Sequence, residues 1–206
     1  MKLYYSPAAC SLAAHITARE AGIAVDLVKV DLGTHRLVDS TDYYSINPRG
    51  YVPALRLDDG TLLTEVVAIV QYLGDLRPES AVVPPAGTMA RVHLQEWLTF
   101  VSSEIHKVFS PWLWHKETAE STRREAKSRL ALRFAELDRL LARQDHLLGT
   151  AFTVADAYAF TILNWSCPLA VDLQPYPRLR AYMARVAARP QVVEALGAEG
   201  LLKKAA

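Results

Sequence analysis

The stretch from Arg77 to Thr88 constrains the fold of this chain most, because the sequence changes character across it. It contains three prolines and one glycine and shows no hydrophobic periodicity, which is typical of a linker. The segments before it alternate between strand and helix patterns, whereas those after it are all helical. We therefore expect a domain of residues 1–77, a linker of residues 78–87 and an all-helical domain of residues 88–206.

The beginning of the chain has the pattern strand, helix, strand. Lys2–Tyr5 is a short apolar run, Ser11–Gly22 has apolar residues at helical spacing before a terminal glycine, and Val25–Val30 alternates apolar and charged residues. A short crossover helix between two strands favours parallel pairing of those strands. Residues 33–47 are polar with weak periodicity, and they predict a loop with one irregular helical turn.

A hairpin and a helix complete the first domain. Ala54–Leu57 and Thr61–Thr64 flank Asp58-Asp59-Gly60, which is a strong signal for a tight turn between antiparallel strands. Glu65–Leu76 follows with apolar residues at helical spacing. The first domain is therefore predicted to be α/β, with the order β-α-β and then β-β-α.

The second domain is predicted to be all-α. Its expected helices are Met89–Phe109, Ser121–Arg143, Thr153–Cys167, Tyr176–Ala188 and Gln191–Leu196. The third of these begins with a capping-box pattern, in which Thr153 is followed three residues later by Asp156, with Phe152 as the hydrophobic staple. It is apolar almost all round, so we expect it to be the buried centre of the domain. Cys167, near its end, is predicted to be a small buried side chain.

Composition narrows the class of protein. The chain has 206 residues, 51% of them hydrophobic and 22% charged, with a net charge of +1 and scattered basic residues, so nothing indicates a nucleic-acid partner. Charges interrupt every apolar run well short of a membrane span, and Ser6-Pro7 stops the N-terminal one too early for a signal peptide. Two cysteines without metal spacing predict neither a disulfide framework nor a metal site. We expect a soluble, cytoplasmic protein, with the periplasm as the alternative.

A single thiol, Cys10, stands where the first helix is expected to begin. It follows a turn of small residues, Ser6 to Ala9, at the end of the first strand. A helix N-terminus leaves backbone N–H groups unpaired and carries partial positive charge, which favours the thiolate, the form that attacks electrophiles. We therefore predict that Cys10 lies in an active site. The alternative from position alone is a buried structural thiol.

The long helix Met89–Phe109 carries two stripes on nearly opposite sides. The apolar stripe consists of Leu94, Leu98, Val101, Ile105 and Val108. The other stripe consists of Thr99, Ser103, His106 and Ser110. The pattern alone leaves two interpretations: a mildly polar surface, or a binding wall in which His106 handles a proton or pairs with a thiolate.

Pro53 and Glu65 are further candidates for a binding site because of their positions in the predicted elements. Pro53 comes at the start of a strand, where a cis proline in a thioredoxin-like sheet would present the backbone of Val52 to an extended ligand. Most X-Pro bonds are trans, so Pro53 could equally be an ordinary loop proline. Glu65 opens a helix, where a carboxylate is favourable in any case, and its functional interpretation is a partner for a ligand ammonium.

Together these features resemble a cytosolic glutathione S-transferase, and most closely the bacterial beta class. The resemblance covers essentially the whole chain, and the Cys10-Ser11 pair distinguishes this class from relatives with Tyr or Ser at that position. The segments that carry it are Met1–Pro7 with Cys10–Leu12, Asn47–Leu55, Asp58–Gly60 with Leu63–Glu65, Glu104–Lys107 and Phe152–Tyr158. The resemblance implies a thioredoxin-like β-α-β-α-β-β-α domain, an all-helical domain, a glutathione site between them and a homodimer.

The resemblance also implies residue roles. Cys10 and His106 would be the catalytic pair. Glutathione would be bound by Ser11, His35, Tyr51, Val52, Pro53, Glu65, Val66, Thr99, Ser103 and Lys107. From position, the electrophile site would be lined by Tyr5, Phe109, Trp112, Trp114 and Trp165. Glutathione would be the co-substrate, and no metal would be required.

This chain departs from the family pattern at two positions. Val66 replaces a small or polar residue, so only its backbone N–H remains to bind the γ-glutamyl carboxylate. His35 replaces a lysine, and a histidine loses its charge near neutral pH.

We therefore predict a glutathione transferase that joins glutathione to small hydrophobic electrophiles, with thiol–disulfide exchange through Cys10 as a second activity. The alternatives are a glutaredoxin-like thiol transferase and a non-catalytic binding module with this fold.

Overall fold

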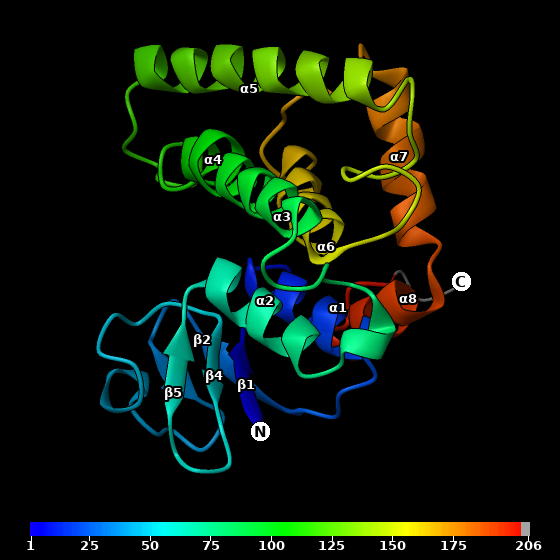
Figure 1. Ribbon diagram of the computed structural model, residues 1–206. Helices are drawn as coiled ribbons and strands as arrows, with labels where there is room; N and C mark the ends of the chain where they lie inside the picture. The colour runs from blue at the N-terminus through cyan, green and yellow to red at the C-terminus, as the bar shows by residue number, and fades with distance from the viewer. Residues whose placement is uncertain (203–206) are drawn as a thin grey trace. The chain divides into compact units, whose positions relative to one another are not determined.

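Two compact units make up the chain in the computed structural model, which describes residues 1–202. Unit 1 contains Met1–Val83 and the C-terminal segment from Arg189, and unit 2 is Pro84–Ala188 (Figure 1). The division at Val83 and Pro84 falls inside the predicted linker. Residues 203–206, the end of the predicted second domain, lie outside the described residues.

Unit 1 is built on a five-stranded sheet with the order β3-β2-β1-β4-β5. The strands are β1 (Lys2–Tyr5), β2 (Asp26–Asp31), β3 (Arg36–Leu37), β4 (Ala54–Arg56) and β5 (Leu62–Thr64). The β1–β2 pair is parallel and the β4–β5 pair is antiparallel, which confirms the predicted crossover and hairpin. β3 was not predicted, because two residues are too few for a detectable alternation.

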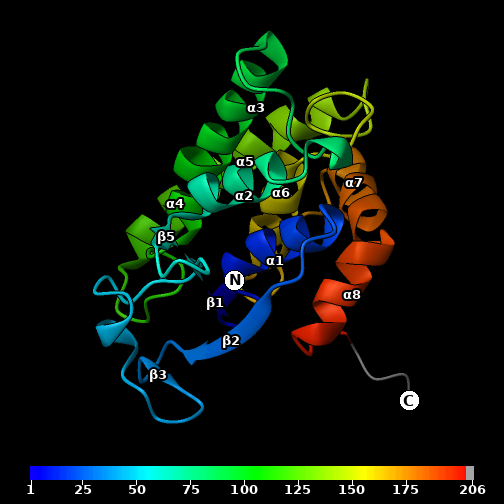
Figure 2. The ribbon, with the colours of Figure 1, turned by 60° about the horizontal axis from the view of Figure 1, so that its bottom comes forward.

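Three α-helices accompany this sheet: α1 (Ser11–Glu20), α2 (Val66–Asp75) and α8 (Pro190–Ala198). Residues 11–18 of α1 are all buried, because α1 contacts α2 and α8 as well as β1. Figure 2 shows α8 beside α1, and β2 leading into β3 at the sheet edge. Where the resemblance implies a helix between β2 and β4, the structure has only the 3₁₀ turn η1 (Tyr43–Ser45). A second 3₁₀ turn, η2, covers Pro78–Ser80.

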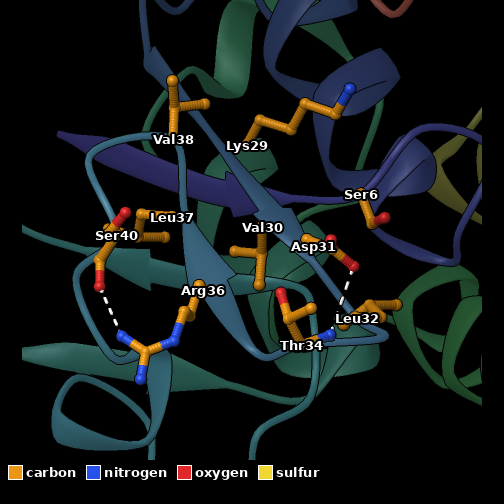
Figure 3. Close-up of a pocket in the computed structure, with 10 residues that line it drawn as sticks. All are labelled: Ser6, Lys29, Val30, Asp31, Leu32, Thr34, Arg36, Leu37, Val38 and Ser40. Atoms are coloured by element: carbon orange, nitrogen blue, oxygen red, sulfur yellow. Dashed lines mark hydrogen bonds between the residues drawn. The ribbon is translucent and has the colours of Figure 1, made fainter.

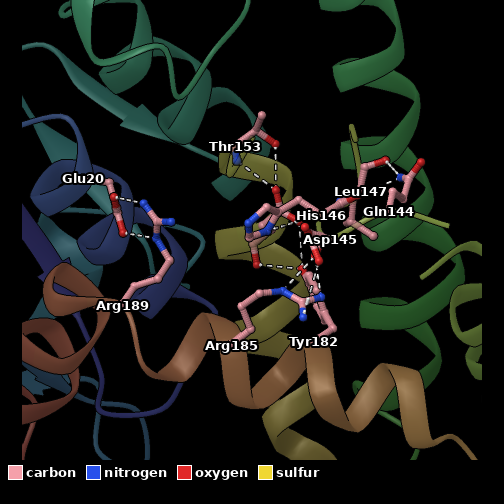
Figure 4. Close-up of polar contacts among 10 residues, drawn as sticks. Glu20, Gln144, Asp145, His146, Leu147, Thr153, Tyr182, Arg185 and Arg189 are labelled. Carbon is pink, nitrogen blue, oxygen red and sulfur yellow. Dashed lines mark hydrogen bonds and ion pairs between the residues drawn. The ribbon is translucent and has the colours of Figure 1, made fainter. Parts of the chain in front are cut away.

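Ion pairs fasten the C-terminal segment to α1. Arg189 donates two hydrogen bonds to the carboxylate of Glu20, at 2.7 and 2.8 Å, and Figure 4 shows this forked pair. Arg19 donates to Glu194 at 2.9 Å. A bidentate arginine–carboxylate pair is among the stronger polar contacts in proteins, so α8 is firmly attached to the sheet-containing unit.

Unit 2 is helical throughout. Its elements are α3 (Met89–Phe100), the π-helical segment η3 (Val101–His106), α4 (Lys107–Phe109), α5 (Glu120–Leu140), α6 (Val154–Leu163), the 3₁₀ turn η4 (Asn164–Ser166) and α7 (Pro177–Ala187). The predicted helix Met89–Phe109 is thus continuous but changes its winding at Val101. Because a π turn holds more residues than an α turn, the buried stripe ends at Ile105 and Phe109, and Val108 is only half-buried.

The capping box at the start of α6 is confirmed. The buried carboxylate of Asp156 accepts hydrogen bonds from the Thr153 N–H at 2.8 Å and the Leu147 N–H at 2.9 Å. The hydroxyl of Tyr182 on α7 donates to the same carboxylate at 3.0 Å. Every residue of α6 is buried, so α6 is the core of unit 2 as predicted. Figure 4 shows Thr153, Leu147 and Tyr182 converging here.

No helix within residues 1–202 has both the length and the apolar character needed to cross a bilayer.

Candidate functional site

The turn that carries Cys10 is tightly fastened to its own helix. The hydroxyl of Ser11 donates to the Ser6 carbonyl and accepts from the Ser6 N–H, both at 3.2 Å. The Ala9 N–H closes the turn on the Ser6 carbonyl at 3.0 Å. Cys10 is the N-cap residue of α1 and is half-buried. Ser11 is fully buried, and its side chain holds the turn.

A residue near the C-terminus supports the same turn. Ala8 has a φ of 61°, a left-handed conformation that is unfavourable for a residue with a side chain. Its N–H donates to the carboxylate of Glu199 at 3.1 Å, and the other carboxylate oxygen lies 3.0 Å from Nδ1 of His15. Glu199 is only 6% exposed. Sequence reasoning missed this residue, because a lone glutamate near a chain end carries no motif.

Cys10 faces the loop that was predicted to bind a ligand. Its thiol donates to the carbonyl of Val52 at 3.1 Å, and the Val52–Pro53 peptide is cis, as expected for a thioredoxin-like sheet. Only a protonated thiol can donate this bond. The exposed residue Tyr51 is held through its carbonyl, which accepts hydrogen bonds from Tyr43 and Asn47 at 2.9 and 2.8 Å.

His35 lies next to this loop and is half-buried. Its ring packs against Tyr44 with ring centroids 4.6 Å apart. Gly50, at a φ of 69°, permits this packing, since a Cβ there would be 2.6 Å from Tyr44 and 3.0 Å from His35. The Nδ1 atom of His35 is buried and makes no hydrogen bond among the described residues.

Glu65 and Val66 form the start of α2. The helix begins at Val66, one residue later than predicted, and Glu65 is the N-cap residue with a φ of 69°. A left-handed conformation at a non-glycine residue is often found at binding sites. The carboxylate of Glu65 is exposed and pairs with Arg49 at 3.0 Å. The side chain of Val66 is buried, and Val66 is the first residue of the helix.

His106 is the last residue of the π segment in unit 2. Its Nδ1 lies 2.6 Å from the hydroxyl of Tyr158, and its ring is edge-on to Trp165 at 5.0 Å. Burial and then the neighbouring charge of Lys107 lower the pKa of His106 to about 4. The imidazole is therefore neutral at physiological pH, and it acts as a hydrogen-bonding group with one N–H.

An aromatic cluster surrounds Trp165, as part of the predicted electrophile site. Trp114 contacts it edge-on at 5.7 Å and Phe109 at 6.2 Å. Trp114 is 47% exposed, whereas Phe109 and Trp165 are buried, so Trp114 is the member of this contact set that solvent reaches. Trp112 is half-exposed and makes no ring contact with another described residue. Tyr5 belongs to unit 1 and is buried there, where desolvation and then the charge of Glu199 raise the pKa of its hydroxyl.

The remaining predicted residues on the long helix are at its surface. Thr99, Ser103 and Lys107 are exposed, and the Ser103 hydroxyl donates to the Thr99 carbonyl at 3.0 Å. The prediction that Cys167 is buried was wrong. Because α6 ends at Leu163 and a 3₁₀ turn follows, Cys167 lies beyond the core and is exposed.

A separate hollow of about 600 Å³ lies beside β2 and β3 and is lined by Lys29, Asp31 and Arg36 among others (Figure 3). Arg36 in this hollow donates to the Ser40 carbonyl, and Asp31 accepts from the Thr34 N–H. None of the residues predicted to bind glutathione lines it. Within residues 1–202, no group of three or more His, Cys, Asp or Glu side chains is arranged to hold a metal ion.

Comparison with known proteins accounts for both units. The family model for the N-terminal domain of glutathione S-transferases matches residues 8–76, and the model for the C-terminal domain matches residues 100–190. Glutathione S-transferase GstA of Escherichia coli O157:H7 is 44% identical over 201 residues, which cover 98% of this chain and 100% of GstA.

Solved structures agree with these matches. A ternary complex of BphK, a bacterial glutathione S-transferase, has a TM-score of 0.95 at 47% identity and covers 98% of this chain and 100% of the BphK chain. The beta-class enzyme of Sphingomonas chungbukensis has a TM-score of 0.94 at 44% identity, with the same coverage. Since both family domains occur in order and relatives align along nearly the whole chain, this protein belongs to the glutathione S-transferase family and, within it, to the bacterial beta class.

Proposed function

We propose that this glutathione transferase binds glutathione against the turn and loop in which Cys10 and Val52 meet. The observation that supports this most is the 3.1 Å contact between the Cys10 thiol and the Val52 carbonyl, beside a cis proline. There the backbone of Val52 pairs with the extended tripeptide as a strand edge does. The exposed carboxylate of Glu65 holds the ligand ammonium, and the N–H of Val66, at the N-terminus of α2, binds the γ-glutamyl carboxylate.

In the conjugation reaction, the glutathione thiol first loses its proton to solvent. The resulting thiolate forms a carbon–sulfur bond with the electrophile, and the bond to the leaving group breaks with its electron pair. The N-terminus of α1, where Cys10 lies, favours negative charge on sulfur through its unpaired N–H groups. His106, neutral at the working pH, supports this charge as a hydrogen-bond donor.

The aromatic cluster around Trp165 is proposed to take the electrophile. Its rings meet edge-to-face, and the side chain of Trp114 is 47% exposed, so a flat apolar group can pack against it. We therefore expect small aromatic electrophiles to be preferred over aliphatic ones of the same reactivity.

A second activity, thiol–disulfide exchange, is favoured by the half-exposed Cys10 thiol. Its thiolate attacks the glutathione sulfur of a mixed disulfide between glutathione and a substrate thiol, so that a Cys10–glutathione mixed disulfide forms and the substrate leaves as its thiolate. A second glutathione then attacks the mixed disulfide and releases Cys10 and oxidised glutathione.

One pair of variants tests the two roles. C10A should abolish hydroxyethyl-disulfide reduction and retain part of the conjugation of chlorodinitrobenzene, whereas C167A, which removes the exposed second cysteine, should leave both activities unchanged. Equal loss of both activities in C10A would contradict separate roles. Failure of the wild type to bind immobilised glutathione, or activity only with disulfides, would support one of the two rival functions.

We also propose that the protein is a homodimer in the cytoplasm. The family resemblance supports the dimer, and the need for reduced glutathione supports a reducing compartment. Light scattering coupled to size exclusion would measure the assembly, and a mass of one chain would contradict it.

A further inference from the structure

The hydroxyl of Tyr158 is paired with one specific atom of His106. Tyr158 lies on α6, is fully buried, and places its Oη 2.6 Å from Nδ1 of the imidazole. The two rings meet edge-to-face, with centroids 5.8 Å apart and planes at 86°. No hydrogen bond among the described residues involves Nε2 of His106, so this nitrogen is left for a ligand.

The surroundings restrict both partners to this arrangement. Trp165 packs edge-on to the imidazole, with ring centroids 5.0 Å apart. The π segment that carries His106 is tied to α5 by Arg133, which donates to Glu104 at 2.9 Å. Tyr158 follows the capping box of Thr153 and Asp156 within the buried helix α6, so its backbone has little freedom. The imidazole therefore has one favourable orientation.

The pairing also determines which nitrogen carries the proton. Burial and the charge of Lys107 keep the imidazole neutral, so it has one N–H and one lone pair. A phenol hydroxyl is the more acidic donor and an imidazole nitrogen the stronger base, so the short contact is satisfied best when Tyr158 donates to Nδ1. The proton of His106 is then on Nε2.

We propose that Tyr158 is a positioning residue that fixes the tautomer and orientation of His106, so that its Nε2–H is a preset hydrogen-bond donor to an anionic sulfur. This inference rests on the proposed role of His106 in the transferase reaction. It assigns His106 a donor role and excludes that of a general base, because the only lone pair of the ring is occupied by Tyr158. Tyr158 itself need not touch either substrate.

The test compares two buried tyrosines in full-length protein. Y158F removes the hydroxyl at Nδ1 and keeps the ring, whereas the control Y182F removes a buried hydroxyl that donates to Asp156, away from His106. The ¹⁵N shifts of the His106 ring should show the Nε2–H tautomer in the wild type and in Y182F, and a mixture of tautomers in Y158F. We expect Y158F to lower kcat of conjugation about tenfold with little change in KM for glutathione, the loss typical of one orienting hydrogen bond.

Three outcomes would overturn the proposal. The first is a His106 ring proton on Nδ1 in the wild type, and the second is an unchanged His106 tautomer in Y158F. The third is a loss of kcat in Y182F as large as that in Y158F, at matched thermal stability. A different result separates it from the function on which it rests: if H106Q keeps full conjugation activity while the tautomer shifts in Y158F as expected, the proposed role of His106 is wrong and the tautomer assignment stands.

Discussion

The carboxylate of Glu199 accepts a hydrogen bond from the N–H of Ala8 at 3.1 Å, across a separation of 191 residues in sequence. Ala8 is in a left-handed conformation, two residues before Cys10. Its amide thus has a buried anionic acceptor, which offsets the cost of that conformation. The last described turn of the chain therefore helps to shape the turn that carries the predicted nucleophile.

Replacement of Glu199 by Gln should destabilise unit 1 and lower both activities. The amide keeps one acceptor oxygen but loses the charge, and it places an N–H₂ group where the Ala8 N–H or His15 requires an acceptor. We expect a loss of about 1–3 kcal/mol in the free energy of unfolding, the usual cost of an unsatisfied buried donor. Urea unfolding would measure it.

The control for this variant is E194Q. Glu194 pairs with Arg19 at 2.9 Å but is 53% exposed, so its loss should cost less than about 1 kcal/mol. Equal loss of unfolding free energy in E194Q and E199Q would mean that the Glu199 contact with Ala8 stabilises the protein no more than an exposed ion pair does.

Stability should fall below neutral pH in a way that depends on His106. The pKa of its imidazole is about 4 in the folded protein, against an ordinary 6.5, because burial and the Lys107 charge disfavour the cation. As the pH falls from 6.5 toward 4, the unfolded chain binds this proton first, so the folded state loses stability over that range. The contribution is on the order of 2–3 kcal/mol.

The H106N variant isolates this contribution, because asparagine does not titrate. Urea unfolding at pH 7 and pH 4.5 should show a larger loss of stability for the wild type than for H106N. Parallel pH dependence of the two proteins would show that the imidazole is not held neutral by the fold.

Glutathione binding should weaken from mildly acid to alkaline pH if His35 contacts the glycyl carboxylate. A histidine supplies a cation only in the acid part of this range, whereas a lysine supplies one throughout. The KM for glutathione should therefore rise with pH in the wild type and change less in H35K. A flat wild-type KM would exclude His35 as the contact. The control is R36Q, which changes the neighbouring residue that lines the separate hollow and should leave the pH dependence of KM as in the wild type.

Local patterns made much of the fold predictable. The parallel β1–β2 pair, the β4–β5 hairpin and the capping box of Thr153 and Asp156 each depend on residues close together in sequence. These elements could be predicted because a few neighbouring residues determine the geometry of a turn or a helix cap. Cys10 and Val52 were each predicted to belong to the site, but the contact between the Cys10 thiol and the Val52 carbonyl was not predicted.

Features that depend on distant partners were not predictable. Nothing near Glu199 indicates that it meets Ala8, and nothing near Tyr158 indicates that it meets His106. The π segment was also missed, because its apolar residues suit an α-helix equally well. Cys167 was misplaced, because the predicted helix continued through η4 and the structure ends α6 at Leu163.

Gly50 should be irreplaceable by alanine for two separable reasons. Its φ of 69° is unfavourable for any side chain, and a Cβ would meet Tyr44 at 2.6 Å and His35 at 3.0 Å. G50A should therefore displace these rings and the loop that leads to Val52, raising KM for glutathione.

The control is G60A, whose φ is 89° but whose Cβ would meet nothing within 4 Å. We expect G60A to cost about 1 kcal/mol of stability from the backbone alone, and G50A to cost more. Calorimetry and glutathione kinetics on both variants would decide, since equal stability and equal KM would mean that the close approach of Gly50 to His35 and Tyr44 does not shape the site.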